Sequence, residues 1–234
     1  MAIRFLLILG SATLAISGSP AHSDTIDMTN LGPNDLVITE YLANPVGIGD
    51  TEAEYFEIYN TTNHEVDLTG LVVRDDGSNE FTVAGAMIAP LSFAVFSNSD
   101  GAALGLTPTY VYGSRMSLTN GDDEIALYRP DDMLINKVAY DDGDWFGAGI
   151  AHELVTIDAM LATLTIGPTL GDDFIAATTP LPLGNFGSPG GPGNTLVQAP
   201  PVPLPAGIWL FMSALGSLGW IRKRIRPQNR LTAS

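Results

Sequence analysis

Two stretches decide the fold, Leu36-Val-Ile-Thr-Glu-Tyr-Leu42 and Glu54-Tyr-Phe-Glu-Ile-Tyr-Asn60. Both are rich in β-branched and aromatic residues, which favour strands. Successive side chains of a strand point to opposite faces. The second stretch therefore places Tyr55 and Glu57 on one face and Phe56 on the other, and both stretches are predicted strands.

Similar segments follow at intervals of roughly ten residues, separated by Gly, Asn, Asp and Pro, which is the pattern of an antiparallel sandwich. They cover residues 66–73, 81–84, 91–97, 109–112, 124–128 and 134–140. No long amphipathic helix is indicated before residue 146. The sequence therefore predicts an all-β protein. Residues 157–165 fit either a short helix or another strand, and residues 178–184 are a predicted loop.

The N-terminus has the features of a secretory signal helix. Arg4 precedes an apolar stretch at residues 5–16, and Ala21-His22-Ser23 offers the small residues that a signal peptidase needs. We expect cleavage between Ser23 and Asp24. A permanent membrane helix is disfavoured by the shortness of the stretch and by Gly18-Ser19-Pro20.

The C-terminal part predicts a transmembrane helix. Val202-Pro203-Leu204-Pro205-Ala206 leads into an uncharged, mostly apolar run at residues 207–221. Residues 204–221 would span roughly 27 Å as a helix, close to the thickness of a bilayer core. The basic cluster Arg222, Lys223, Arg224 and Arg226 follows. By the positive-inside rule this cluster stays in the cytoplasm and the preceding chain lies outside.

This tail resembles the PEP-CTERM class of sorting signals, in the variant marked by Val-Pro-Leu-Pro-Ala at residues 202–206. The resemblance implies processing by an exosortase in a Gram-negative envelope, after transient insertion into the inner membrane. The product would reside at the outer surface or in the extracellular matrix. An ordinary membrane anchor is the alternative.

The expected organisation has six parts. They are a signal peptide (1–23), an N-terminal arm (24–33), a β-sandwich (34–195), a linker (196–201), the sorting motif with its helix and basic cluster (202–226), and a tail (227–234).

The predicted exported part is strongly acidic and has no cysteine. Between residues 24 and 201, four Lys and Arg stand against 26 Asp and Glu, a net charge of −22. Such a surface repels nucleic acid, whose binding depends on Lys and Arg. It suits divalent cations or cationic surfaces, although acidic residues also serve as a solubility coat. A domain without disulfides must be stabilised by its core.

No catalytic residues are predicted. His64 and His152 stand apart from any His-Glu-x-x-His helix, and no Gly-x-Ser-x-Gly elbow occurs. Glu54 and Glu57 are three residues apart on a strand, so they point to opposite faces. We expect one of them to accept hydrogen bonds from backbone amides and the other to face water.

Calcium is the one cofactor that the sequence suggests. Asp141, Asp142 and Asp144 surround Gly143, and calcium takes roughly six to eight oxygen ligands from such loops. The twelve-residue EF-hand pattern is absent. The alternative is that these residues serve as ordinary turn residues, since Asp and Gly favour turns for backbone reasons.

A second resemblance covers residues 34–195, which look like the bacterial lamin-tail domain. The positions that match the family pattern are Glu40, Asn44, Glu54, Glu57, Asn60, Asp67, Leu68 and Gly70. Later matching pieces are residues 120–127, 138–140, 152–155 and 187–194. Leu71 departs from the usual Trp.

The resemblance implies an immunoglobulin-like sandwich that binds or packs without chemistry of its own. We therefore expect a non-enzymatic surface protein with an adhesive or structural role. The alternative is a secreted accessory module that binds calcium or polysaccharide, or recruits a separate hydrolase.

Overall fold

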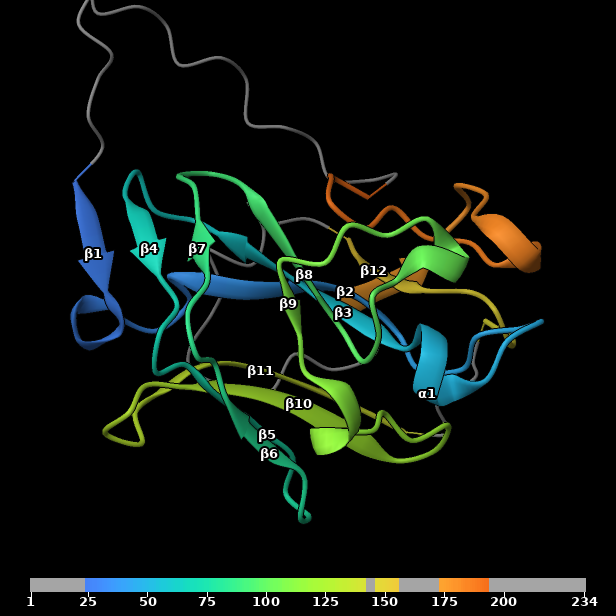
Figure 1. Ribbon diagram of the computed structural model, residues 1–234, viewed down its shortest axis with the longest axis horizontal. Helices are drawn as coiled ribbons and strands as arrows, with labels where there is room; N and C mark the ends of the chain where they lie inside the picture. Colours follow the sequence, from blue (N-terminus) through green and yellow to red (C-terminus); the bar gives the residue numbers. More distant parts are fainter. Residues whose placement is uncertain (1–23, 142–145, 156–172, 194–234) are drawn as a thin grey trace, which may run out of the picture. The chain divides into compact units, whose positions relative to one another are not determined.

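A computed structural model describes residues 24–141, 146–155 and 173–193, and its main feature is two facing β-sheets (Figure 1). The larger sheet has the strand order β13 (Phe174–Ala176), β12 (His152–Leu154), β2 (Leu36–Leu42), β3 (Tyr55–Asn60), β8 (Phe93–Ser97) and β9 (Tyr110–Val111). The smaller sheet has the order β11 (Leu134–Tyr140), β10 (Asp123–Tyr128), β5 (Val72–Arg74) and β6 (Glu80–Thr82). The predicted all-β sandwich is confirmed.

A third sheet and short helices complete the described part. The third sheet has the order β1 (Thr25–Asp27), β4 (Glu65–Asp67) and β7 (Met87–Ile88). The helical turns are η1 (Met28–Asn30), α1 (Asp50–Ala53), η2 (Ala102–Leu104), η3 (Gly113–Arg115) and η5 (Pro182–Gly184). Pairing is antiparallel except between β1 and β4 and between β8 and β9.

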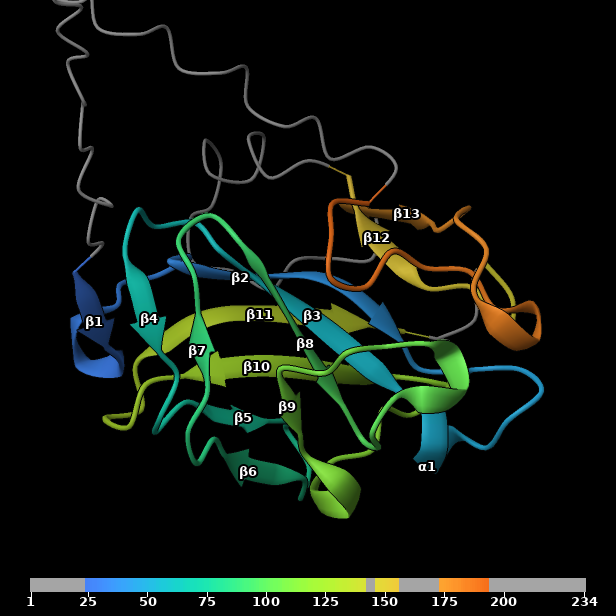
Figure 2. The ribbon, with the colours of Figure 1, turned by 45° about the horizontal axis from the view of Figure 1, so that its top comes forward.

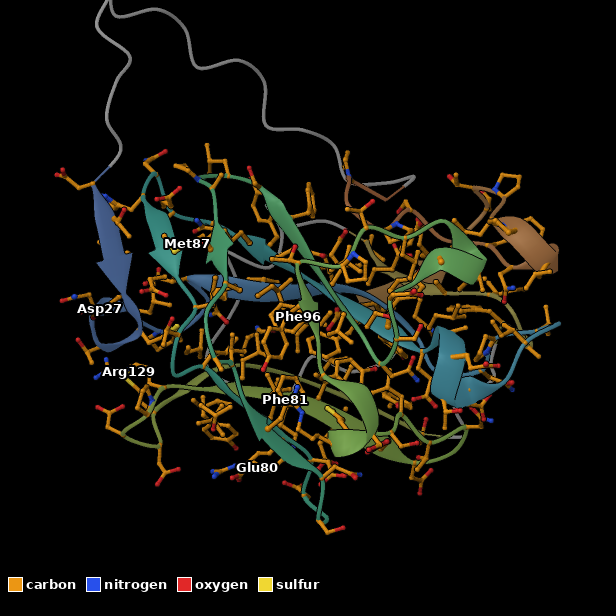
Figure 3. The ribbon with its side chains drawn as sticks, viewed as in Figure 1. Asp27, Glu80, Phe81, Met87, Phe96 and Arg129 are labelled. Carbon is orange, nitrogen blue, oxygen red and sulfur yellow. The ribbon has the colours of Figure 1, made fainter. Side chains whose placement is uncertain are left out.

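The main core lies between the two large sheets. Phe56 and Phe96 stack with ring centroids 5.0 Å apart, and Phe81 from the smaller sheet lies 6.5 Å from Phe96. Figure 3 shows Phe81 and Phe96 in the space between the layers. Phe56 and Ile58 belong to this core and Tyr55 to a second cluster on the other face, so the predicted alternation along β3 is confirmed.

The predicted strand at residues 66–73 is instead two strands in different sheets. Gly70 has a φ of +93°, a conformation that residues with a side chain rarely adopt. The chain turns there and leaves the third sheet for the smaller main sheet. Leu68 and Leu71, on either side of the turn, are both fully buried. The predicted strands at 36–42 and 134–140 match β2 and β11.

Residues 24–33, expected as a separate arm, are part of the sandwich. β1 pairs with β4, and Met28 and Leu31 are each 1% exposed. The polar composition of the segment conceals these two core side chains. Asp27 caps η1, and Thr29 and Asn30, which lie between Met28 and Leu31, donate hydrogen bonds to it.

The predicted terminal helices lie outside the described residues. This applies to the signal at residues 1–23, the sorting motif and apolar run at 202–221, and the undecided segment at 157–165. Within the described ranges, no helix has the length and apolar character needed to cross a membrane.

Truncation of the aromatic core should destabilise the protein strongly. We expect Phe96→Ala to lower the free energy of unfolding by about 3–5 kcal/mol, because it leaves a cavity beside Phe56 and Phe81. Urea denaturation of the purified protein measures this. Met87→Ala is the control, since Met87 is 44% exposed, and its effect should stay within about 0.5 kcal/mol. A loss below about 1 kcal/mol for Phe96→Ala would contradict the described core.

Candidate functional site

The candidate site lies on the other face of the larger sheet, where three glutamates stand side by side on adjacent strands. Glu153 of β12 is paired with Glu40 of β2, and Glu40 is paired with Glu57 of β3. All three residues are at most 1% exposed. We call Glu153, Glu40 and Glu57 the glutamate ladder. Like charges directly opposite each other on neighbouring strands are destabilising, so this arrangement requires compensation.

A β-bulge at Thr39 puts Glu40 in the ladder. Ile38 is paired with Ile58 and faces the main core, and two residues later Glu40 should face the same way. The register shift between Ile38 and Glu40 adds one residue to β2 and reverses the alternation. Tyr41 then points into the main core, and Glu40 points to the opposite face.

The compensation comes from a glycine-rich segment at residues 187–193, here called the strap. The Ser188 amide donates to Glu40, with N–O distances of 2.9 and 3.1 Å to its two carboxyl oxygens. The Ser188 Oγ lies 2.7 Å from Glu40 Oε2 and 3.0 Å from Glu153 Oε1. The Gly190 amide donates to Glu57 Oε2 over 2.6 Å. Each glutamate therefore has a partner in the strap.

The strap is glycine-rich because it lies directly on the ladder. A Cβ at Gly187 would meet the Tyr55 hydroxyl and would lie 2.6 Å from Glu40 Oε1. A Cβ at Gly193 would lie 2.8 Å from Glu153 Oε2. Figure 2 shows the segment that contains the strap, in orange, running back beside β12. Glycine at these positions permits the close approach of backbone to carboxyl groups.

The pKa values of two carboxyl groups of the ladder are raised, which favours their protonated form. Burial raises the pKa of Glu40 to about 7, against the opposing effect of hydrogen bonds from Tyr55 and Ser188. Burial and then the neighbouring Glu40 raise the pKa of Glu57 well above its ordinary value. Desolvation penalises the charged form of a carboxyl group, which explains both shifts.

A small apolar cluster adjoins the ladder on the same face. Its buried members include Leu42, Tyr55 and Val95, and Phe186 packs on it from the chain just before the strap. The Tyr55 hydroxyl donates a short hydrogen bond to Glu40 Oε1. The strap is therefore attached to the sheet by polar contacts at the ladder and by apolar packing beside it.

Glu54 lies on the opposite face from Glu57, as the strand period predicts. Its Oε2 accepts hydrogen bonds from the Leu118 amide at 3.2 Å and from Asn98 Nδ2 at 3.3 Å. Burial raises its pKa to about 7. The expectation that either Glu54 or Glu57 accepts from backbone amides is confirmed for both. The expectation that the other faces water is wrong, because segments distant in sequence cover each of them.

His152 is part of an aromatic stack. Its ring lies 4.5 Å from Tyr41 and 4.7 Å from Phe146, and Tyr41 stacks on Tyr140 at 4.7 Å. Burial lowers the pKa of His152 to about 4, so the ring is neutral near pH 7. His64 is exposed in the loop before β4. The structure does not bring the two histidines together.

The calcium prediction depends on residues that are mostly outside the described part. Asp141 is exposed, whereas Asp142 and Asp144 fall in the undescribed range 142–145. Within the described ranges no three His, Cys, Asp or Glu side chains converge as metal ligands would. Other acidic turn residues act on the backbone: Asp75 Oδ1 accepts from the amides of Gly77 and Asn79. Calcium binding stays a prediction.

Sequence reasoning identified the members of this site but not their meeting. Glu40 and the closing glycines are predicted only as matches to a family pattern, and Glu153 only as part of the matching piece at residues 152–155. Glu57 is predicted as such a match and as a possible acceptor of backbone hydrogen bonds. The ladder depends on the Thr39 bulge, for which the sequence offers no signal. The glycine content of residues 187–193 was the available indication that backbone lies close to another group.

Comparison with known proteins supports the lamin-tail interpretation over part of the chain. The family model described as Lamin Tail Domain matches residues 30–142. The match contains Glu40 and Glu57 but ends before β12 and the strap. A search of curated proteins found no match. This match supports a binding or structural module.

Close packing of the strap can be tested by adding one methyl group. We expect Gly187→Ala to destabilise the protein by about 1–3 kcal/mol, because the new Cβ overlaps Tyr55 and Glu40. Gly191→Ala is the matched control, since its nearest contact would be the Ser188 carbonyl oxygen at 3.9 Å. Thermal or urea unfolding measures both. Equal effects of the two substitutions would mean that the strap does not lie on the ladder.

The buried state of His152 gives a second test. Its ring should titrate with a midpoint of about 4 when followed by NMR chemical shifts. Because this pKa is lowered, the unfolded state binds more protons, and His152 makes the protein less stable as pH falls from about 6.5 towards 4. A midpoint above about 6 would place the ring in water and contradict the stack.

Proposed function

We propose that this chain is an exported, non-catalytic surface or matrix protein. An exosortase-type system would sort it, and its lamin-tail-like sandwich would act in adhesion or as a structural unit. The observation that carries the proposal is the order of residues 202–226: the Val-Pro-Leu-Pro-Ala motif, the apolar run and the basic cluster. Signal peptidase would act on the other end of the chain, between Ser23 and Asp24.

The geometry of the sandwich suits this role. In the candidate site, the strap covers the side chains of the glutamate ladder and is hydrogen-bonded to them. The site therefore holds the strap on the larger sheet. The strap ends at Gly193, and eight residues separate it from Val202. A protein attached through a processed C-terminus would therefore be joined to its support directly after the strap.

The charge of the exported part limits the partners. With a net charge of −22, this part would approach cationic groups or anionic polymers bridged by divalent ions, and nucleic acid is not an expected partner. This charge also favours the second candidate function, an accessory module that binds calcium and polysaccharide. That candidate depends on Asp142 and Asp144 joining Asp141 in one site.

The first experiment is intact-mass measurement of the protein from its own host, in envelope and medium. A chain that begins at Asp24 and ends near Val202 is the expected result, and added mass at the new end would identify the attachment. A chain that still ends at Ser234 would overturn the sorting proposal and leave a membrane anchor.

A pair of matched variants tests the motif itself. The double substitution Pro203→Ala and Pro205→Ala should block processing, because it alters the signature. The same change at Pro200 and Pro201, just before the motif, should leave the processed mass unchanged. Processing of both variants alike would show that the motif is not what the enzyme recognises.

A further inference from the structure

The hydroxyl of Ser188 bridges two carboxyl groups of the glutamate ladder. A serine hydroxyl has a single hydrogen to donate, yet Ser188 Oγ lies within hydrogen-bond distance of both Glu40 Oε2, at 2.7 Å, and Glu153 Oε1, at 3.0 Å. A proton on Glu40 would satisfy both contacts, because Glu40 would then donate to Ser188 Oγ and the serine hydroxyl would donate to Glu153.

Among the described residues, no ion pair brings a positive charge to Glu40 or Glu57. Glu40 accepts from Tyr55 and Ser188, and Glu57 accepts from Thr39 Oγ at 2.7 Å and from Gly190. The ion pairs found among the described residues join Arg74, Arg129 and Lys137 to Asp76, Glu80, Asp131 and Asp132. None of these pairs includes Glu40 or Glu57.

The titratable groups that face the ladder can be named from each strand packed against it. Glu153 faces Glu40 from β12, and Tyr55 and Glu57 face it from β3. On β8 the residue paired with Glu57 is the apolar Val95, and on β13 the residue paired with Glu153 is the apolar Ile175. Ionisation of the ladder would therefore place negative charges opposite each other in a buried site.

We propose that the glutamate ladder is a proton-operated clasp: with its protons it holds the strap on the sheet, and their loss above neutral pH releases residues 187–193 while the sandwich stays folded. The main core does not include the ladder, so release of the strap leaves the packing between the two large sheets intact. This inference goes beyond the proposed function and does not depend on how the tail is processed.

The sign of the pH dependence follows from the raised pKa values. A carboxyl group whose pKa is higher in the folded state stabilises that state below its ordinary pKa, and this contribution is lost as pH rises through the folded value. For Glu40 the loss occurs between about 4.5 and about 7, and Glu57, whose pKa is also raised, adds a loss of the same sign. The strap should be held most firmly in mildly acidic solution.

A local measurement is needed, because Glu54 has a pKa raised in the same direction and affects stability elsewhere. We propose amide hydrogen exchange between pH 5.5 and 8.5, corrected for the intrinsic exchange rate. Protection of the Ser188 and Gly190 amides should fall by up to about tenfold for each pH unit above the midpoint, per proton released. Core amides such as Ile58 should change less.

The test variant is Glu40→Gln, which imitates the protonated form. Its amide oxygen can accept from Tyr55 and from the Ser188 amide, and its NH2 group can donate to Ser188 Oγ, which then donates to Glu153. We expect strap protection to fall less with pH than in the wild-type protein, by up to about tenfold per pH unit for the one proton that Glu40 no longer releases, while Glu57 keeps its own contribution. Glu54→Gln, the same change on the opposite face, should keep the wild-type dependence.

Two outcomes would overturn the proposal. Strap protection that is constant with pH in the wild-type protein would mean that the ladder does not release its protons in this range. An equal fall in wild-type protein and in Glu40→Gln would mean that another group controls the strap. If Glu40→Gln does not fold, Glu57→Gln replaces it, because it preserves the contacts with Thr39 and Gly190 and should also weaken the dependence.

Discussion

The pairing of β2 with β3, interrupted by the bulge at Thr39, is the constraint on which the rest of the structure depends. On one side of the bulge Ile38 faces the main core, and on the other side Tyr41 does. Glu40 is thereby directed to the second face, where a charged side chain can meet a covering segment. Without the extra residue, the carboxyl group of Glu40 would enter a core of stacked aromatic rings.

Burial of three carboxyl groups is costly, and the structure offsets the cost with hydrogen bonds and protons. An ionised carboxylate removed from water and left unpaired is strongly unfavourable, so such groups are usually bonded or neutral. Here both remedies apply, since strap amides bond to Glu40 and Glu57 and their pKa values are raised. A buried polar cluster of this kind defines one position for the strap, because a shifted segment would leave the carboxyl groups without donors.

Local sequence patterns predicted those features of the fold that depend on residues close together in the sequence. The strands β2 and β11 and the alternation along β3 follow from residue type and period alone. The division of residues 66–73 at Gly70, the burial of Met28 and Leu31, and the meeting of Glu40, Glu57 and Glu153 depend on pairing between distant segments. The strap contacts with Glu40 and Glu57 join positions well over a hundred residues apart, and no single-sequence pattern encodes such a distance.

The pairing of β12 with β2 also bears on where the folding unit ends. The family match stops at residue 142, but β12 begins at His152 and forms the neighbour of β2 in the larger sheet. A fragment cut at residue 142 would turn β2 from an interior strand into an open sheet edge and uncover Glu40 and Glu57. Open edges pair with other chains and promote aggregation. For this protein, soluble expression is therefore expected to require the chain through the strap, well beyond the limits of the matched domain.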